Sequence, residues 1–221
     1  MTLSKEKEQV YIERVRMDGN ELQSIDEQTE EVCLEAVKQN GHALKYVKEQ
    51  TDIICLAAVQ QRGWALEYVE KQTENICLEA VKQYGTALEY VKEQTPTICL
   101  AAVKQNGLAL EYVKQQTENI CLEAVKENGW VLESVEKQTE ELKLASFSNF
   151  SRMYHEWGLR DYTSFLEIIK NPTQEMTSLY NLLEYWDDHW PSYREIRSKL
   201  ATGELTVHQS PYHVLDCMYK S

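Results

Sequence analysis

A repeat of 22 residues is the feature that most constrains how this chain folds. Glycines recur at a constant step of 22 positions, and the same step relates a series of threonines, a series of glutamines and a series of cysteines. The glycines are Gly19, Gly41, Gly63, Gly85, Gly107 and Gly129. Repetition at a fixed period of this length is typical of solenoids, in which each repeat packs only on its neighbours.

Each repeat predicts two short helices that meet at the glycine. In the repeat 73–94, Thr73 is suited to cap a helix, and the apolar residues between Ile76 and Val81 have helical spacing. We expect Gly85 to end this helix in the left-handed backbone conformation. Isolated helices shorter than roughly 12–15 residues are marginal in water, so these helices must pack on neighbouring repeats. The predicted fold class is therefore all-α, an α-solenoid of 22-residue helix-turn-helix repeats with a C-terminal helical cap segment.

Three regions follow from the register of the repeat. Residues 1–28 read as an imperfect N-terminal capping repeat, because their helical face is more polar than that of later repeats. Residues 29–150 read as the helical repeat solenoid. Ser151 stands where the next glycine is due, and we expect residues 151–221 to form a non-repeating, aromatic-rich helical domain.

The repeat also resembles a known family. The strings AVKQNGHALKYV at 36–47, AVKQNGLALEYV at 102–113 and AVKENGWVLESV at 124–135 resemble the tandem helical repeats called domain of unknown function 4116. The resemblance covers residues 7 to about 145. It implies a helical repeat fold. It implies no particular chemistry, because the biochemical role of that family is not established.

Five of the six cysteines occupy one repeated position on the apolar face of the first helix. These are Cys33, Cys55, Cys77, Cys99 and Cys121. Packed helices lie about 10 Å apart, which is beyond the reach of a disulfide. We predict buried free thiols that fill the space between helices. The alternative, a ladder of soft-metal sites, requires thiols of different repeats to converge.

Composition limits the possible partners. The formal net charge is −13, and there is no basic stripe of the kind that binds phosphates, so direct nucleic-acid binding is not expected. The first residues are polar rather than a signal peptide, and the longest apolar run, 53–59, is far short of the ~20 residues that cross a bilayer. These features predict a soluble cytoplasmic protein that does not bind membranes. The acidity either keeps a long surface soluble or steers the chain toward basic proteins.

The positions that vary between repeats suggest a binding surface. The residues on either side of each glycine differ from repeat to repeat, and stacking of the repeats places them in a row along one edge. Trp, Tyr and Arg dominate the energetics of protein interfaces. We predict a partner-binding surface, the turn ridge, at Arg62, Trp64, Tyr84, Leu108 and Trp130. The alternative is that these tryptophans only pack over the turn of the next repeat.

The threonine that opens each repeat and the glutamine that closes it are constant. We expect the threonine to cap the following helix and the glutamine to bond free carbonyls at the end of the preceding helix. The alternative is a polar ladder that grips a peptide.

No catalytic constellation is recognisable in the sequence. His213 and Cys217 have helical i, i+4 spacing, and Asp187, Asp188 and His189 are contiguous, but a closed zinc site needs four ligands. The motifs of nucleotide-binding, metalloprotease and serine hydrolase families are missing from the sequence. We therefore predict no enzyme activity, no cofactor, and no catalytic or metal-binding residues.

The sequence as a whole predicts a non-enzymatic protein–protein interaction module, in the form of an acidic inhibitor or adaptor that binds a basic surface of another protein. Two alternatives remain open. One is a DNA mimic, in which Glu67, Glu89, Glu111 and Glu133 imitate phosphates to block a nucleic-acid-binding protein. The other is an enzyme whose active site lies in the C-terminal segment.

Overall fold

The computed structural model describes residues 4–146, 149 and 168–170, and the regular elements it describes are all helices. This confirms the all-α fold class. The chain divides into two compact parts, Met1–Glu127 and Asn128–Ser221. The elements of the first part are α1 (Lys5–Met17), η1 (Gly19–Ser24), α2 (Glu30–Gln39), η2 (Gly41–Tyr46), α3 (Asp52–Gln61), η3 (Gly63–Tyr68), α4 (Glu74–Gln83), η4 (Gly85–Tyr90), α5 (Pro96–Gln105), η5 (Gly107–Tyr112) and α6 (Glu118–Glu127). The second part contains η6 (Gly129–Ser134) and a helical stretch over residues 140–146.

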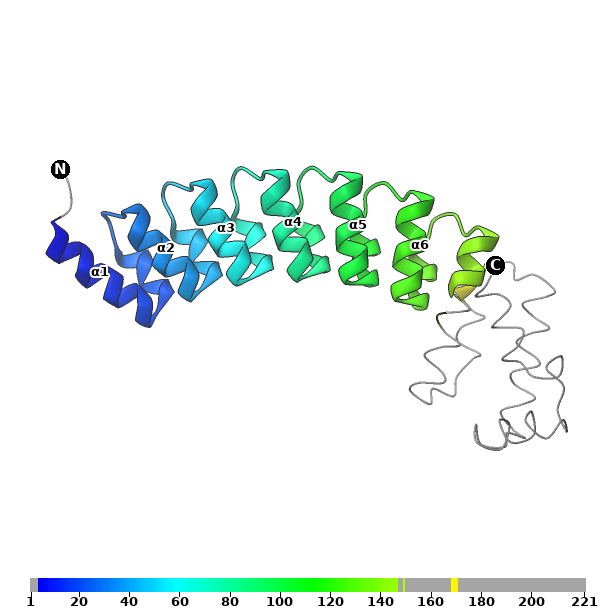
Figure 1. Cartoon of the computed structure of the whole chain (residues 1–221), viewed down its shortest axis with the longest axis horizontal. Helices are drawn as coiled ribbons and strands as arrows, with labels where there is room; N and C mark the ends of the chain where they lie inside the picture. The colour runs from blue at the N-terminus through cyan, green and yellow to red at the C-terminus, as the bar shows by residue number, and fades with distance from the viewer. Residues whose placement is uncertain (1–3, 147–148, 150–167, 171–221) are drawn as a thin grey trace, which may run out of the picture. The chain divides into compact units, whose positions relative to one another are not determined.

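Each repeat contains an α-helix followed by a 3-10 helix. The helices α2 to α6 have 10 residues each, and the 3-10 helices have six. In the first part, the α-helices lie side by side in chain order, and each 3-10 helix also contacts the α-helix of the next repeat (Figure 1). The predicted helix pairs are therefore present. The second helix of each pair is the tighter 3-10 form, which proteins use in short pieces.

The opening threonine caps each α-helix from α2 to α6, as predicted. The hydroxyl of Thr29 accepts a hydrogen bond from the N–H of Val32 at 3.3 Å, and Thr73 accepts one from Ile76 at 3.4 Å. Each bond satisfies one of the backbone donors that a helix leaves free at its N-terminus. In α5, Pro96 follows the cap at a position where no intrahelical donor is needed.

The core lies between successive repeats and has the same composition in each. In the fourth repeat, Ile76, Ala80 and Val81 of α4 and Leu88 of η4 have no exposed surface. The repeat cysteines Cys33, Cys55, Cys77, Cys99 and Cys121 are buried thiols that form no disulfide, as predicted. No repeat buries this face by itself, so stability depends on contact between neighbours.

The role of the repeated glycine differs from the prediction. None of Gly19, Gly41, Gly63, Gly85 and Gly129 adopts the left-handed conformation, so the predicted left-handed helix end is wrong. The helix instead ends at an extended residue such as Asn40, with φ −144° and ψ 107°. A Cβ atom on Gly41 or Gly63 would lie 2.6 Å from the carbonyl oxygen of Ala58 or Ala80 in the next repeat. Glycine is required because two backbones approach closely, not because a turn demands it.

The closing glutamines join each repeat to the next. The Nε2 group of Gln28, Gln50, Gln72 and Gln94 donates to the carbonyl of the tyrosine 18 residues later at 2.8–2.9 Å. The Oε1 atom of the same side chain accepts from the backbone N–H two residues beyond that tyrosine at 2.9–3.0 Å. We call this set the glutamine ladder. Its role is structural, as expected, but the main partners belong to the following repeat rather than to the preceding helix.

The same pair of bonds occurs once more in the second part. Gln138 donates to the carbonyl of Ile168 at 2.9 Å and accepts from the N–H of Lys170 at 2.8 Å. Ile168 follows Gln138 by 30 residues, whereas Tyr46 follows Gln28 by 18. Residues 168–170 therefore take the place of the Tyr-Val-Lys sequence of earlier repeats after twelve additional residues. The other predicted helices of 151–221, with their histidines and Cys217, lie outside the described residues.

We predict that Gly41→Ala destabilises the protein by about 1–3 kcal/mol, because the added Cβ meets backbone of the next repeat. The measurement is urea unfolding followed by circular dichroism. Gly41→Asn distinguishes the two explanations for the glycine. A left-handed position accepts asparagine well, whereas a close backbone contact penalises it at least as much as alanine. Stability of the asparagine variant close to that of the wild type would contradict the prediction.

We also predict that Gln72→Ala lowers the free energy of unfolding by about 1–3 kcal/mol, because it leaves the carbonyl of Tyr90 and the N–H of Lys92 without their partner. Gln72→Glu keeps the acceptor for Lys92 but loses the donor to Tyr90. Protonation restores a donor, so the deficit of this variant should shrink as the pH falls toward 4. Gln60→Glu, at an exposed position, is the control. A pH-independent deficit would argue against this hydrogen-bond geometry.

Candidate functional site

The first of the two positions that form the turn ridge is the residue before each glycine. In the second, fifth and sixth repeats this residue is an asparagine, whose side chain accepts a hydrogen bond from the N–H two residues later at 3.0–3.1 Å. Asn40, Asn106 and Asn128 therefore cap the 3-10 helices. Arg62 and Tyr84 stand at the same position, and their side chains make no capping bond to the helices that they precede. The local structure alone does not account for these two residues.

The residues around the glycines form a row, as expected from the repeat. At two junctions, the residue after one glycine lies against the residue before the next. Asn40 donates to the side chain of Asn20 at 3.2 Å. The rings of Trp64 and Tyr84 lie 5.5 Å apart at 44°.

Four of the five predicted ridge residues lie in the first part and are open to solvent. Trp64 is 47% exposed, Tyr84 45% and Leu108 50%, and Arg62 is also exposed. Trp130 is half-buried and belongs to the second part. The contact between Trp64 and Tyr84 is the packing over the next repeat that the alternative interpretation expects. About half of each side chain nevertheless remains available for a partner.

His42, which follows Gly41, also belongs to this row. Its ring meets the ring of Tyr68 edge-on, with the centroids 5.7 Å apart, and its buried Nε2 atom has no hydrogen-bond partner among the described residues. Burial, then the positive charges of Arg62 and Lys45, lowers the pKa of His42, while Glu67 opposes the shift. The imidazole is therefore neutral near pH 7.

A second row of side chains lies at the C-terminal ends of the 3-10 helices. We call it the tyrosine row: Tyr46, Tyr68, Tyr90 and Tyr112. Each tyrosine is half-buried and follows an exposed charged residue, Lys45, Glu67, Glu89 or Glu111 respectively. Burial raises the pKa of Tyr90, and Glu89, Glu67 and the neighbouring Tyr68 and Tyr112 add to the shift. Successive members of the row therefore lie within electrostatic reach of one another.

The glutamine ladder fixes the tyrosine row in place. The carbonyl that each glutamine binds is that of the tyrosine itself. The hydrogen bond that joins two repeats therefore also positions the backbone of a residue in the tyrosine row. This row was not predicted from the sequence. The signal was present in the 22-residue spacing of the tyrosines and in the glutamates that precede three of them.

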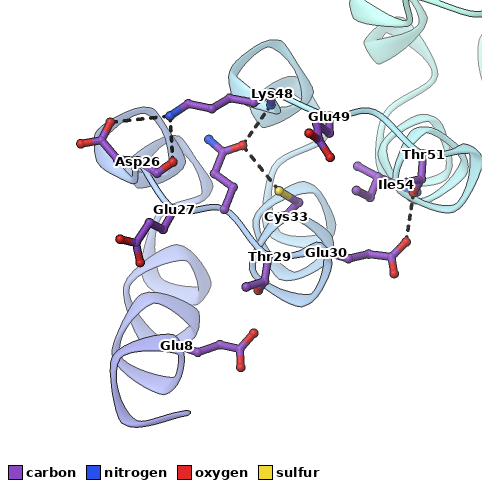
Figure 2. A pocket seen from close by; sticks show the side chains of 11 residues that line it. Glu8, Asp26, Glu27, Thr29, Glu30, Cys33, Lys48, Glu49, Thr51 and Ile54 are labelled. Atoms are coloured by element: carbon purple, nitrogen blue, oxygen red, sulfur yellow. Dashed lines mark hydrogen bonds and ion pairs between the residues drawn. The ribbon is translucent and has the colours of Figure 1, made fainter. Parts of the chain in front are cut away.

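An acidic hollow of about 670 Å³ opens at the junction of the first three repeats. Its carboxylates are Glu8, Asp26, Glu27, Glu30 and Glu49. Figure 2 shows the ammonium group of Lys48 reaching the Asp26 carboxylate, at 3.6 Å, and the hydroxyl of Thr51 bonded to Glu30, at 3.1 Å. A smaller hollow of about 260 Å³ occurs at the equivalent place between the fourth and fifth repeats. The feature thus recurs on the repeat surface, and of these two hollows the one nearer the N-terminus is the larger.

The cysteine that lines this hollow, Cys33, is buried. Burial, with a smaller contribution from Glu30, raises the pKa of the Cys33 thiol to about 11. Its Sγ–H group donates to the side chain of Gln28 at 3.7 Å. A protonated buried thiol reacts poorly. Across the described ranges, no three His, Cys, Asp or Glu side chains are placed to hold a metal ion.

Part of the repeat array matches a known family. Residues 53–94 and 96–143 match the model described as Domain of unknown function (DUF4116). The match confirms the resemblance that the repeat strings indicate. Among curated proteins and among solved structures, none matches the chain.

The two DUF4116 segments include the whole turn ridge from Arg62 to Trp130 and the tyrosine row from Tyr68 onward. The second segment ends at Lys143, in the helix of the seventh repeat. No helix in the described part of the chain is long and apolar enough to cross a bilayer.

We predict that acidification destabilises the wild type more than the variant His42→Thr, which carries the residue found at the equivalent position of the fourth repeat, Thr86. The pKa of His42 is lowered in the folded state, so the unfolded chain binds the proton more readily. The free energy of unfolding therefore falls as the pH drops below about 6.5. The measurement is urea unfolding at pH 7.5 and 5.5. An equal loss in both proteins would contradict the lowered pKa, because the carboxylates are common to both.

We also predict that the five repeat cysteines of the native protein react slowly with a thiol reagent at pH 7.5 and rapidly in urea. Their burial and the raised pKa of Cys33 and Cys55 are the reasons. The measurement is mass spectrometry of protein labelled with iodoacetamide, in a Cys217→Ser background that removes the sixth thiol. Rapid labelling of Cys33 in the native protein would contradict the burial of its thiol.

Proposed function

We propose that this protein is a non-enzymatic interaction module that binds another protein through the turn ridge, acting as an acidic adaptor or inhibitor toward a partner with a basic surface. The observation that carries the proposal is the substitution of the capping asparagine by Arg62 and Tyr84. Losing such a cap costs about 0.5–2 kcal/mol. A change that costs local stability and places an arginine and an aromatic ring at the surface is typical of a binding residue.

The surroundings of these two residues support the proposal. Trp64 packs against Tyr84, and Leu108 extends the exposed apolar surface into the fifth repeat. Trp64, Tyr84 and Leu108 are among the most exposed large apolar side chains of the described residues. The net charge of −13 favours association with a basic partner.

The spacing of the acidic residues favours a protein partner over DNA mimicry. Glu67, Glu89 and Glu111 recur once per repeat, and packed helices are separated by about 8–10 Å. Duplex DNA carries one charge per about 1.7 Å of its axis. A row of single carboxylates at repeat spacing imitates that charge density poorly.

The proposal is tested by capture from a native lysate followed by mass spectrometry. The wild type is compared with the double variant Trp64→Glu, Tyr84→Glu, after circular dichroism confirms that the variant folds. Lys71→Glu, at an exposed position between η3 and α4, has the same net charge change and is the matched control. A partner held by the wild type and the control but lost from the double variant supports the proposal. A partner held equally by all three proteins would exclude the turn ridge.

A further inference from the structure

The tyrosine row offers a surface whose chemistry fits a positively charged segment. Tyr68, Tyr90 and Tyr112 are half-buried, and each follows an exposed glutamate. An aromatic ring attracts a cation over its face, and an adjacent carboxylate adds to that attraction. The ring and the carboxylate recur together in three successive repeats. The glutamine ladder binds the backbone carbonyl of each tyrosine, so it fixes the points from which the three rings project.

The second repeat shows a cation in place on one member of this row. Lys45 stands where the next three repeats have glutamate, and its ammonium group lies over the ring of Tyr46, 4.7 Å from the centroid. The chain itself thus supplies an ammonium ion to one tyrosine. The corresponding places over Tyr68, Tyr90 and Tyr112 are flanked by Glu67, Glu89 and Glu111 instead.

We propose that Tyr68, Tyr90 and Tyr112, with the three glutamates that precede them, bind a lysine- or arginine-rich segment of a partner protein in the polyproline II conformation. One cationic side chain lies over each tyrosine ring, as Lys45 does over Tyr46. This inference rests on the proposed function and names the chemistry of the partner. The turn ridge then contacts other parts of the same partner.

The spacing of the repeats selects this conformation. Neighbouring helices are separated by about 8–10 Å. A polyproline II helix has three residues per turn and rises about 3.1 Å per residue, so every third side chain projects from the same face after about 9 Å. A β-strand places side chains on one face at about 6.6 or 13 Å, and neither distance fits. In an α-helix, side chains seven residues apart lie on the same face, about 10.5 Å from each other. Placing one cation over each of three tyrosines would therefore take about 15 residues of α-helix, compared with about seven residues of polyproline II.

The test uses synthetic peptides and the full chain. Fluorescence anisotropy measures binding of a labelled peptide Lys-Pro-Pro-Lys-Pro-Pro-Lys, with Lys-Lys-Lys-Pro-Pro-Pro-Pro as a control of equal composition and charge. We expect the spaced peptide to bind more tightly than the clustered one. Tyr90→Leu should weaken binding of the spaced peptide roughly two- to five-fold, the value of one cation–π contact, whereas Tyr90→Phe should not. Equal binding of both peptides, or no effect of Tyr90→Leu, would overturn the inference.

Lys45 provides a test in the opposite direction. Lys45→Glu removes the internal cation and gives the second repeat the glutamate of its neighbours, so a fourth place opens over Tyr46. A longer peptide with four spaced lysines should then bind the variant several-fold more tightly than it binds the wild type. Lys71→Glu makes the same charge change away from the row and should show no such gain. An equal gain in both variants would reduce the effect to net charge and overturn the inference.

The two proposals fail in different ways. If neither peptide binds but a cellular partner is lost from the Trp64→Glu, Tyr84→Glu variant, the protein-binding function stands and the polyproline II inference is wrong. If the spaced peptide binds and responds to Tyr90→Leu while no partner depends on the ridge, the tyrosine row is the binding surface and the ridge is packing. An α-helical peptide with lysines seven residues apart that binds more tightly than the spaced peptide would exclude the polyproline II conformation.

Discussion

The structure depends on one side-chain amide per repeat that replaces a missing backbone partner. The closing glutamine presents a donor and an acceptor, and the next repeat presents a carbonyl and an N–H group two residues apart. This pairing resembles the exchange of hydrogen bonds between neighbouring strands, but it is made between a side chain and a 3-10 helix terminus. It satisfies polar groups that six-residue helices leave free. A repeat without its neighbour loses both its apolar contacts and these bonds.

The two surface rows gain their geometry from this arrangement. The backbone has nearly the same conformation in successive repeats. Side chains at equivalent positions of successive repeats therefore lie in a row, one repeat apart. The variable positions beside the glycines and the charged positions before the tyrosines are free to differ, because neither contributes to the core. His42, whose ring meets Tyr68, shows that the two rows adjoin each other. A partner that covers one row therefore lies close to the other.

The sequence predicted what the 22-residue period determines and missed what depends on contacts between repeats. The helix pairs, the threonine caps and the buried cysteines follow from local pattern and periodicity. The role of the glycine was predicted wrongly, because a left-handed helix end is the usual local reason for a glycine at this place. The actual reason is the close approach of Gly41 to Ala58, and of Gly63 to Ala80, which is a contact between repeats. Six apolar-patterned residues do not distinguish an α-helix from a 3-10 helix. A seventh repeat that starts at Thr139 and then fades was expected, but its continuation at 168–170 was missed. The sequence Leu-Glu-Ile-Ile-Lys at 166–170 resembles Leu-Glu-Tyr-Val-Lys at 110–114, but twelve extra residues break the period.

Those twelve residues show where this architecture accepts new sequence. In the second part, Asn149 still binds the N–H of Gly129 at 2.8 Å, and Ile168 still receives the amide of Gln138. Both ends of the lengthened connection therefore keep the bonds that an ordinary repeat makes. The junction between position 149 and position 168 is thus a place in the sequence where extra residues are accepted while these two bonds are kept. A recognition loop inserted at one junction and again at the next would be displayed at the spacing of the repeats. The number of repeats between two such loops would then set the distance between the two binding sites for a multivalent ligand.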